Sequence, residues 1–270
     1  MDMHRLAARG VMLLGCGKMG SAMLAGWLAE GLPPTAVSVV DPAPSEWLRG
    51  TGVALGLPDA APGIVIVAVK PQMMGAALPV LAAWGAGDTV FVSVAAGTPI
   101  AAFETMLGAG TPVVRAMPNT PAAIGQGITA IVANAAAGED GLAQAELLLS
   151  AVGQVVRLDT EDQMDAVTGV SGSGPAYVFH LIETLAAGGV AQGLPEALAM
   201  QLAKATVAGA GALAATPGAE PAQLRVNVTS PNGTTQAALE VLMEGATGFP
   251  ALVPRAVAAA TERSKELRNG

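Results

Sequence analysis

A glycine pattern with the spacing GxGxxG stands near the start of the chain. Its residues are Gly15, Cys16, Gly17, Lys18, Met19 and Gly20. An apolar run, 11–14, precedes the pattern, and a helix-like stretch, 21–29, follows it. In this context the first glycine permits a tight turn, the second admits a pyrophosphate, and the third lets helix and strand pack closely. All six residues are therefore candidate contacts of a dinucleotide, although Lys18 could equally be a solvated lysine at a helix start.

An acidic residue, Asp41, follows the next apolar run, 37–40. A carboxylate at this point can accept a hydrogen bond from a ribose 2′-hydroxyl, which favours NADH over NADPH. Aspartate before a proline, here Pro42, is also a common turn residue. Both interpretations stay open, and the expected cofactor is NADPH or NADH.

These motifs need a sheet to position them. Up to about residue 158, short β-branched runs alternate with alanine-rich stretches, a rhythm typical of βαβ units and a mainly parallel sheet. The expected strands are residues 11–14, 37–40, 64–69, 89–94, 113–115, 128–132 and 155–158.

Ligands of such sheets lie beyond the carboxyl ends of the strands. The segments that follow the later strands add the candidate cofactor contacts Val69, Lys70, Pro71, Ala95, Ala96, Gly97 and Asn119. A lysine that ends a buried strand needs water or an anion, so Lys70 is expected either to contact the cofactor or to reach solvent. Ordinary turn chemistry is the alternative for Asn119.

The pattern changes after residue 160, where helix-like stretches replace the β-rich runs. We expect helices at residues 161–169, 175–190, 195–215, 234–243 and 250–267. The predicted fold is α/β, with an N-terminal Rossmann-type domain at residues 1–159 and an all-α domain at residues 160–270.

Composition excludes several classes of function. The net charge is −8 and basic residues form no run, so no nucleic-acid partner is expected. One cysteine and two histidines supply neither a zinc set nor a Ser-His-Asp triad, and no metal is expected. Apolar runs fall short of the roughly 20 residues that cross a bilayer, and glycines interrupt the only segment like a signal peptide. The sequence therefore predicts a cytoplasmic protein with no membrane partner.

Seven segments resemble the pyrroline-5-carboxylate reductase family. They are GCGKMGSAM at 15–23, VAVKPQ at 67–72, VSVAAG at 92–97, RAMPNTPA at 115–122, GQGITAI at 125–131, DAVTGVSGSGPAYVF at 165–179 and LRVNVTSPNGTTQAALEVL at 224–242. The last two are the most specific. This chain has Lys18 where the family usually has Asn, and Asn232 where it usually has glycine. Because Asn is the non-glycine residue that best adopts positive φ, the loop at Asn232 is expected to keep its shape.

The resemblance implies reduction of L-1-pyrroline-5-carboxylate to L-proline by hydride transfer to the C=N carbon. It also implies an assembly of at least two copies, with the substrate pocket at the dimer interface. The implied substrate residues are Ser230, Asn232, Gly233, Thr234 and Thr235: backbone N–H groups hold the carboxylate, and the Thr235 hydroxyl bonds the ring nitrogen as the catalytic contact. Two alternatives stay open: another imine or 3-hydroxyacid reductase, with Lys204 as its lysine, and a non-catalytic nucleotide-binding homologue.

Overall fold

The computed structural model describes residues 3–269, so Met1, Asp2 and Gly270 at the ends of the two predicted domains lie outside it. The chain forms two compact units. The sheet unit contains the chain up to residue 172 together with the segment from 260, and the helical unit contains residues 173–259. This division differs from the predicted boundary after residue 159, because Met164 is fully buried in the core beneath the sheet.

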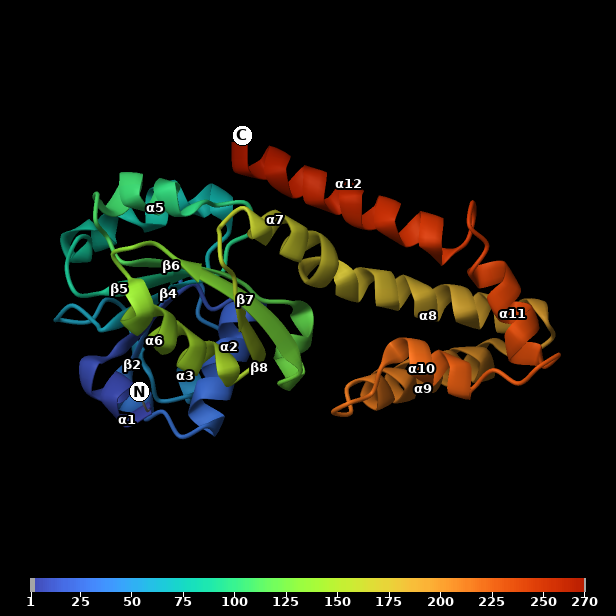
Figure 1. The fold of residues 1–270 in the computed structure, drawn as a ribbon. Helices are drawn as coiled ribbons and strands as arrows, with labels where there is room; N and C mark the ends of the chain where they lie inside the picture. Colours follow the sequence, from blue (N-terminus) through green and yellow to red (C-terminus); the bar gives the residue numbers. More distant parts are fainter. Residues whose placement is uncertain (1–2, 270) are drawn as a thin grey trace. The chain divides into compact units, whose positions relative to one another are not determined.

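Eight strands form one sheet in the order β3-β2-β1-β4-β5-β6-β7-β8 (Figure 1). Their bounds are β1 Val11–Leu14, β2 Val37–Val40, β3 Ala54–Leu55, β4 Ile64–Val67, β5 Val90–Ser93, β6 Val113–Met117, β7 Gly127–Ala133 and β8 Gly153–Arg157. All neighbouring pairs are parallel except β6 and β7. The mainly parallel sheet is confirmed, and the carboxyl ends of β1, β2, β4, β5 and β6 meet at one edge.

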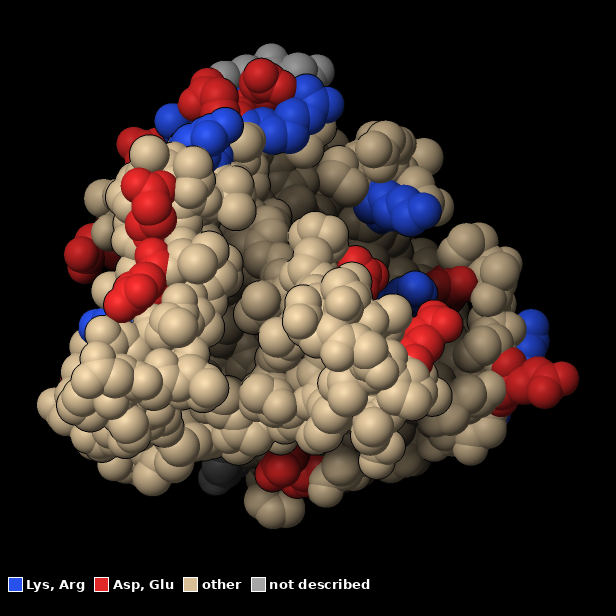
Figure 2. Space-filling model, turned by 90° about the vertical axis from the view of Figure 1, so that its right-hand side faces the viewer, with Lys and Arg blue, Asp and Glu red and all other residues tan. Residues whose placement is uncertain are grey.

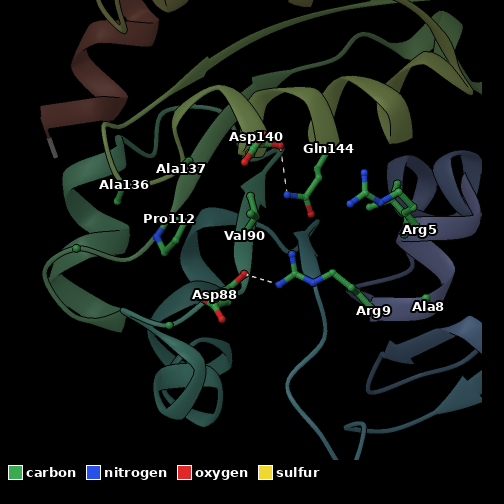
Figure 3. A pocket seen from close by; sticks show the side chains of 14 residues that line it. Arg5, Ala8, Arg9, Asp88, Val90, Pro112, Ala136, Ala137, Asp140 and Gln144 are labelled. Atoms are coloured by element: carbon green, nitrogen blue, oxygen red, sulfur yellow. Dashed lines mark hydrogen bonds between the residues drawn. The ribbon is translucent and has the colours of Figure 1, made fainter. Parts of the chain in front are cut away.

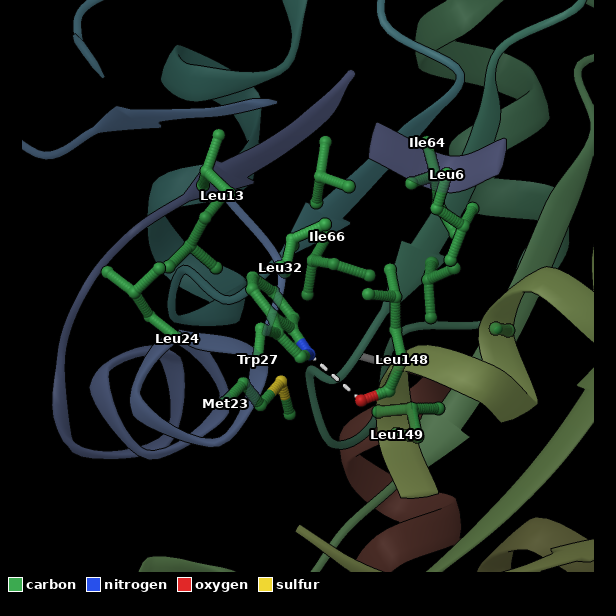
Figure 4. Packing of buried hydrophobic residues seen from close by; sticks show 14 of the residues in the cluster. Leu6, Leu13, Met23, Leu24, Trp27, Leu32, Ile64, Ile66, Leu148 and Leu149 are labelled. Carbon is green, nitrogen blue, oxygen red and sulfur yellow. Dashed lines mark hydrogen bonds between the residues drawn. The ribbon is translucent and has the colours of Figure 1, made fainter. Parts of the chain in front are cut away.

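Helices cover both faces of this sheet because its central strands are apolar on both sides. One face packs against α1 (Met3–Arg9), α2 (Lys18–Ala29) and α6 (Gly138–Ser150). The other packs against α4 (Met74–Ala77), α5 (Ile100–Leu107) and α7 (Gln163–Val167). The buried Trp27 joins α2 to α6, since its Nε1 donates to the Leu148 carbonyl at 2.8 Å (Figure 4).

Short elements connect these layers. They are α3 (Glu46–Gly50), the 3₁₀ helices η1 (Pro34–Ala36), η2 (Pro71–Met73), η3 (Pro79–Trp84) and η4 (Thr120–Ile124), and a π-helical turn, η5 (Thr168–Gly172). The connections that follow β4, β5 and β6 begin at the carboxyl ends of these strands, where the candidate cofactor residues lie.

The helical unit has very little core of its own. It consists of α8 (Gly174–Ala191), α9 (Glu196–Ala214), α10 (Pro221–Asn227), α11 (Thr234–Leu242) and the first part of α12 (Phe249–Asn269). Its buried hydrophobic cluster comprises Ala186, Ala199 and Ala203. Large apolar side chains are exposed instead, among them Phe179, Leu185, Leu202, Leu213, Val241 and Leu252.

Within the described residues, α9 is long and apolar enough to cross a membrane by length and composition, with 11% of the tested window buried. The expectation that no segment comes near this length is therefore wrong for α9. Its many alanines raise the average hydropathy without supplying large side chains. One such helix is weak evidence for a membrane span, because the core helices of many proteins share this composition.

Candidate active site

The glycine-rich loop lies between β1 and α2, and its three glycines have different surroundings. Gly15 has φ +92°, and a Cβ there would lie 2.9 Å from a methyl carbon of Val69. A Cβ on Gly20 would lie 2.3 Å from the Gly15 carbonyl oxygen, so only glycine allows α2 this close to β1. Gly17 faces open space, with no atom within 4 Å of such a Cβ. Open space at this position is what a phosphate group needs to approach the backbone.

The first turn of α2 supplies hydrogen-bond donors to that space. Gly17 is the N-cap, and no side chain caps the helix. In the part of the chain that the structure describes, the N–H groups of Lys18, Met19 and Gly20 have no protein acceptor. Unpaired N–H groups and the helix dipole favour an anion here, so the loop fits the pyrophosphate of a dinucleotide.

Asp41 holds this loop from the end of β2. Its Oδ2 accepts from the Cys16 backbone N–H at 2.7 Å, and its Oδ1 accepts from the Ala43 N–H at 2.8 Å. The second bond is the turn contact expected of aspartate before a proline. The first is long-range and orders the glycine-rich loop itself. Each carboxylate oxygen keeps a lone pair that can accept a ribose hydroxyl.

Cys16 lies in this loop as a neutral thiol. Burial, as the larger cause, and the negative charge of Asp41 together raise the pKa of the Cys16 thiol to about 11. A thiol with this pKa is protonated at neutral pH and is a poor nucleophile. Cys16 therefore contributes its small size and its backbone to the loop.

The strand β4 is shorter than the sequence predicts, so the segment that follows it begins earlier. The strand ends at Val67, where the sequence predicts 69, and Lys70 is an exposed N-cap of η2. The premise that a lysine ends a buried strand is therefore wrong, because the chain leaves the sheet before it. Val69 remains part of the site, since it packs against Gly15. The exposed Lys70 side chain can reach solvent or a bound anion, and Pro71 is exposed beside it.

The loop after β5 is held more firmly. The Ser93 hydroxyl accepts from the Ala95 N–H at 3.3 Å, Ala95 is buried, and Ala96 is exposed. Gly97 has φ +73°, and a Cβ there would lie 3.2 Å from Cβ of Leu267 on α12. Gly97 is thus required both by its backbone conformation and by the packing of the C-terminal helix.

Asn119 lies in the loop that follows β6. Its side-chain Oδ1 accepts from the Ile128 N–H at 3.0 Å, which joins the loop to the start of β7. This is a structural hydrogen bond at the position predicted for a cofactor contact. The candidate residues that follow β1, β2, β4, β5 and β6 therefore lie along one edge of the sheet.

Sequence reasoning missed an ion pair at this edge between a buried arginine and a half-buried glutamate. Arg115 is 2% exposed, and its Nη1 donates to Oε1 of Glu161 at 2.8 Å. The same Glu161 oxygen accepts from the N–H of Ile100, the first residue of α5, at 3.0 Å. The available signal was a single arginine within the apolar strand β6, since a buried arginine requires an acidic partner.

In the helical unit, the loop before α11 contains the implied substrate residues. Asn232 has φ +56°, so the expectation that Asn replaces glycine in a left-handed conformation is confirmed. Gly233 is the N-cap of α11, and no side chain caps this helix. Thr235 lies in the first turn and is half-buried.

Two backbone donors of this loop are already occupied. The Asn232 N–H donates to Oε1 of Gln236 at 2.8 Å, and the Gly233 N–H donates to the Ser230 carbonyl at 3.0 Å. Within residues 3–269, the N–H groups of Thr234, Thr235 and Gln236 donate to no protein acceptor. The free donors are therefore those of residues 234–236, whereas the resemblance implied the backbone of residues 232–234 for the carboxylate.

A cavity of about 870 Å³ lies elsewhere on the sheet unit (Figure 3). Its lining includes Arg5 and Arg9 of α1, together with Asp88, Val90 and Pro112, which lie at the amino ends of β5 and β6. The candidate cofactor residues lie at the opposite ends of these strands. This cavity is therefore not the dinucleotide site.

Two protein families match the chain. The family described as pyrroline-5-carboxylate reductase dimerisation matches residues 161–267, and the family described as NADP oxidoreductase coenzyme F420-dependent matches residues 10–97. A pyrroline-5-carboxylate reductase of Pseudomonas aeruginosa is 41% identical over 95% of this chain and 96% of its own length. The chain belongs to the pyrroline-5-carboxylate reductase family. A reductase of the same name from Synechocystis is 42% identical over 94% of this chain and 97% of its own length.

Solved structures of similar proteins support this family assignment. A pyrroline-5-carboxylate reductase from Coxiella burnetii matches with a TM-score of 0.89 and 32% identity over 96% of this chain and 98% of that one. A pyrroline carboxylate reductase from Plasmodium falciparum, solved with NADP bound, matches with a TM-score of 0.82 and 26% identity over 97% of this chain and 99% of that one. The chain is thus an NAD(P)H-dependent oxidoreductase of this family. This membership argues against the alternative of another imine or 3-hydroxyacid reductase.

The contrast between two glycines of the motif gives a test. Gly20→Ala should lower the free energy of unfolding by about 1–3 kcal/mol, because the new methyl group pushes α2 away from β1. Gly17→Ala should leave that free energy within about 1 kcal/mol of wild type, since its methyl group points into open space. Gly17→Ala should instead weaken NADPH binding at least about tenfold. Chemical denaturation and fluorescence titration with NADPH measure the two effects, and unchanged NADPH affinity in Gly17→Ala would remove Gly17 from the site.

Proposed function

We propose that this chain reduces L-1-pyrroline-5-carboxylate to L-proline with NADPH or NADH, using the residues described above. The observation that carries the proposal is the open space at Gly17, faced by unpaired N–H groups of α2 at the common edge of five strands. When bound there, the cofactor supplies a hydride to the C=N carbon. Residues 1–159 are proposed to bind the dinucleotide, and residues 160–270 to bind substrate and pair the subunits.

The chemical demand on the protein is small. A cyclic imine is basic enough to be protonated near neutral pH, so the substrate supplies its own activated electrophile. The protein then has to orient the imine and exclude competing geometries, which is catalysis by positioning. This agrees with the loop at residues 230–235, which consists of serine, proline, asparagine, glycine and two threonines and has no acidic side chain.

We assign the substrate to the start of α11. The free N–H groups of Thr234, Thr235 and Gln236 can hold the carboxylate at the positive end of the helix dipole. The Thr235 hydroxyl then bonds the ring nitrogen. Asn232 and Gly233 shape the loop through their own hydrogen bonds, and Ser230 serves as the acceptor for Gly233.

The hydroxyl of Thr235 can be tested by a matched series. Thr235→Val keeps the shape without the hydroxyl and should lower kcat/KM by about tenfold to a hundredfold, which is the loss of one hydrogen bond to a charged partner. Thr235→Ser keeps the hydroxyl and should retain most of the activity. Affinity for NADPH should barely change in either variant. Wild-type kcat/KM in Thr235→Val would show that the hydroxyl does not contact the substrate. The serines of residues 171–173 would then be the next candidates.

Cofactor choice depends on Asp41. NADPH would place a phosphate against the carboxylate, so Asp41→Ser should raise the ratio of kcat/KM for NADPH to that for NADH. Both values should fall, because the substitution also removes the acceptor of the Cys16 N–H. Glu46→Gln, which removes an exposed negative charge from α3, is the control for net charge. If both variants leave the ratio unchanged, Asp41 is a loop anchor only.

The helical unit gives reason to propose self-association. Figure 2 views the molecule from the side that is right-hand in Figure 1, and most of the surface drawn is neither acidic nor basic. The exposed apolar side chains of α8 to α12 exceed what a monomeric protein leaves in water. Pairing of these helices would bury them. We therefore propose at least a dimer. We also propose that the protein acts in the cytoplasm without a membrane partner, and that its net charge of −8 leaves it without a nucleic-acid partner.

Assembly can be measured directly. At micromolar concentration, sedimentation should give a dimer or a larger assembly. Leu202→Glu should shift it toward monomer, because Leu202 is an exposed apolar residue of α9. Leu57→Glu is the matched control, since Leu57 is similarly exposed on the sheet unit. A stable and active wild-type monomer would contradict the proposal.

A further inference from the structure

The last turns of α12 contact the loop that follows β5. Cβ of Leu267 lies next to Gly97, close enough that a Cβ at residue 97 would come within 3.2 Å of it. The same glycine belongs to the loop proposed above to contact the cofactor. A segment at the end of the chain thus forms one wall of that loop.

A buried carboxylate anchors this end of α12 to the sheet unit. Asp165 is 1% exposed, and its Oδ1 accepts from the Ser264 hydroxyl at 2.7 Å. Its Oδ2 lies 3.2 Å from Nη1 of Arg268, which also pairs with Asp162 at 3.3 Å. This connection is costly to break, because loss of the guanidinium leaves a buried charge unpaired and loss of the hydroxyl leaves a buried carboxylate oxygen without a hydrogen bond.

The other end of the same loop is anchored by a neighbouring acid. Glu161 accepts from the N–H of Ile100, where α5 begins, and from the buried Arg115. Residues 161–165 therefore hold the loop directly at Ile100, and through Ser264 and Arg268 they hold the helix that contacts it at Gly97. The loop contributes little of its own to this geometry, because two of its residues are alanine and one is glycine.

We propose that Ser264 and Arg268 are positioning residues for the cofactor, acting through Asp165 and Leu267 on the loop at Gly97. This inference rests on the proposed function, since it takes that loop as a cofactor contact. All of these anchors lie within or next to residues 161–267, which match the dimerisation family. The region that pairs the subunits is then also the region that sets affinity for the cofactor.

The test compares polar residues on α12. Arg268→Gln and Ser264→Ala should each raise the Kd for NADPH about three- to tenfold, because only part of the loss of one hydrogen bond to a charged group is transmitted to the cofactor loop. At saturating NADPH, kcat should stay within about twofold of wild type, since the substrate contacts on α11 are untouched. Arg263→Gln is the matched control, because Arg263 pairs only with the exposed Glu266 in the described structure. Ser264→Thr, which keeps the hydroxyl, should restore affinity.

NADPH affinity is read by fluorescence titration, independently of turnover, and the melting temperature is recorded for every variant. A lower melting temperature with unchanged NADPH affinity would overturn the proposal and leave Asp165 a purely structural anchor. Equal loss of affinity in Arg263→Gln would also overturn it. If the wild-type protein itself bound neither NADPH nor NADH, the proposed function would fail, and that outcome is distinct from failure of this inference.

Discussion

The close approach of α2 to β1 is the constraint on which the cofactor edge depends. The Gly15 carbonyl occupies the place that a side chain at Gly20 would need, so the helix can begin directly beyond the strand only with glycine at both positions. This approach brings the first-turn N–H groups to the end of the central strand. Asp41 then fixes the turn between them by accepting from Cys16. Parallel pairing of β1 with β2 and β4 adds the neighbouring loops to the same edge.

The two units of the chain differ in how many apolar side chains they bury. The sheet unit has two hydrophobic clusters, one on each face. The helical unit has a cluster of three alanines and leaves leucine, valine and phenylalanine side chains in water. In the proposed assembly, pairing with a second copy would remove these side chains from water. Stability, assembly and cofactor binding are therefore expected to be linked in this protein.

Much of the sheet could be predicted from the sequence. The runs at 11–14 and 37–40 match β1 and β2 residue for residue, because glycine and proline bound short apolar stretches. Strand β3 escaped prediction, since it has two exposed residues and exists only through pairing with β2. The antiparallel direction of β7 is not encoded in its apolar pattern. The short helix α10 likewise has no buried residue to mark it.

The site was predictable where one short motif carries its own geometry. The glycine motif and Asp41 are local signals, and so is the left-handed conformation at Asn232. Partners that are distant in sequence were not predictable: Glu161 is 46 residues from Arg115, and Ser264 is 99 residues from Asp165. The occupied N–H groups of Asn232 and Gly233 were also hidden, because they depend on how the loop folds onto Gln236 and Ser230.

The most direct test of the account is turnover of the purified chain with L-1-pyrroline-5-carboxylate. Oxidation of NADH and of NADPH is followed by absorbance in separate reactions, and L-proline is quantified in each. The account predicts cofactor oxidation that requires the imine and yields one L-proline for each hydride consumed. A protein that binds the cofactor but forms no L-proline with either nucleotide would be a non-catalytic homologue, and the central claim would be wrong.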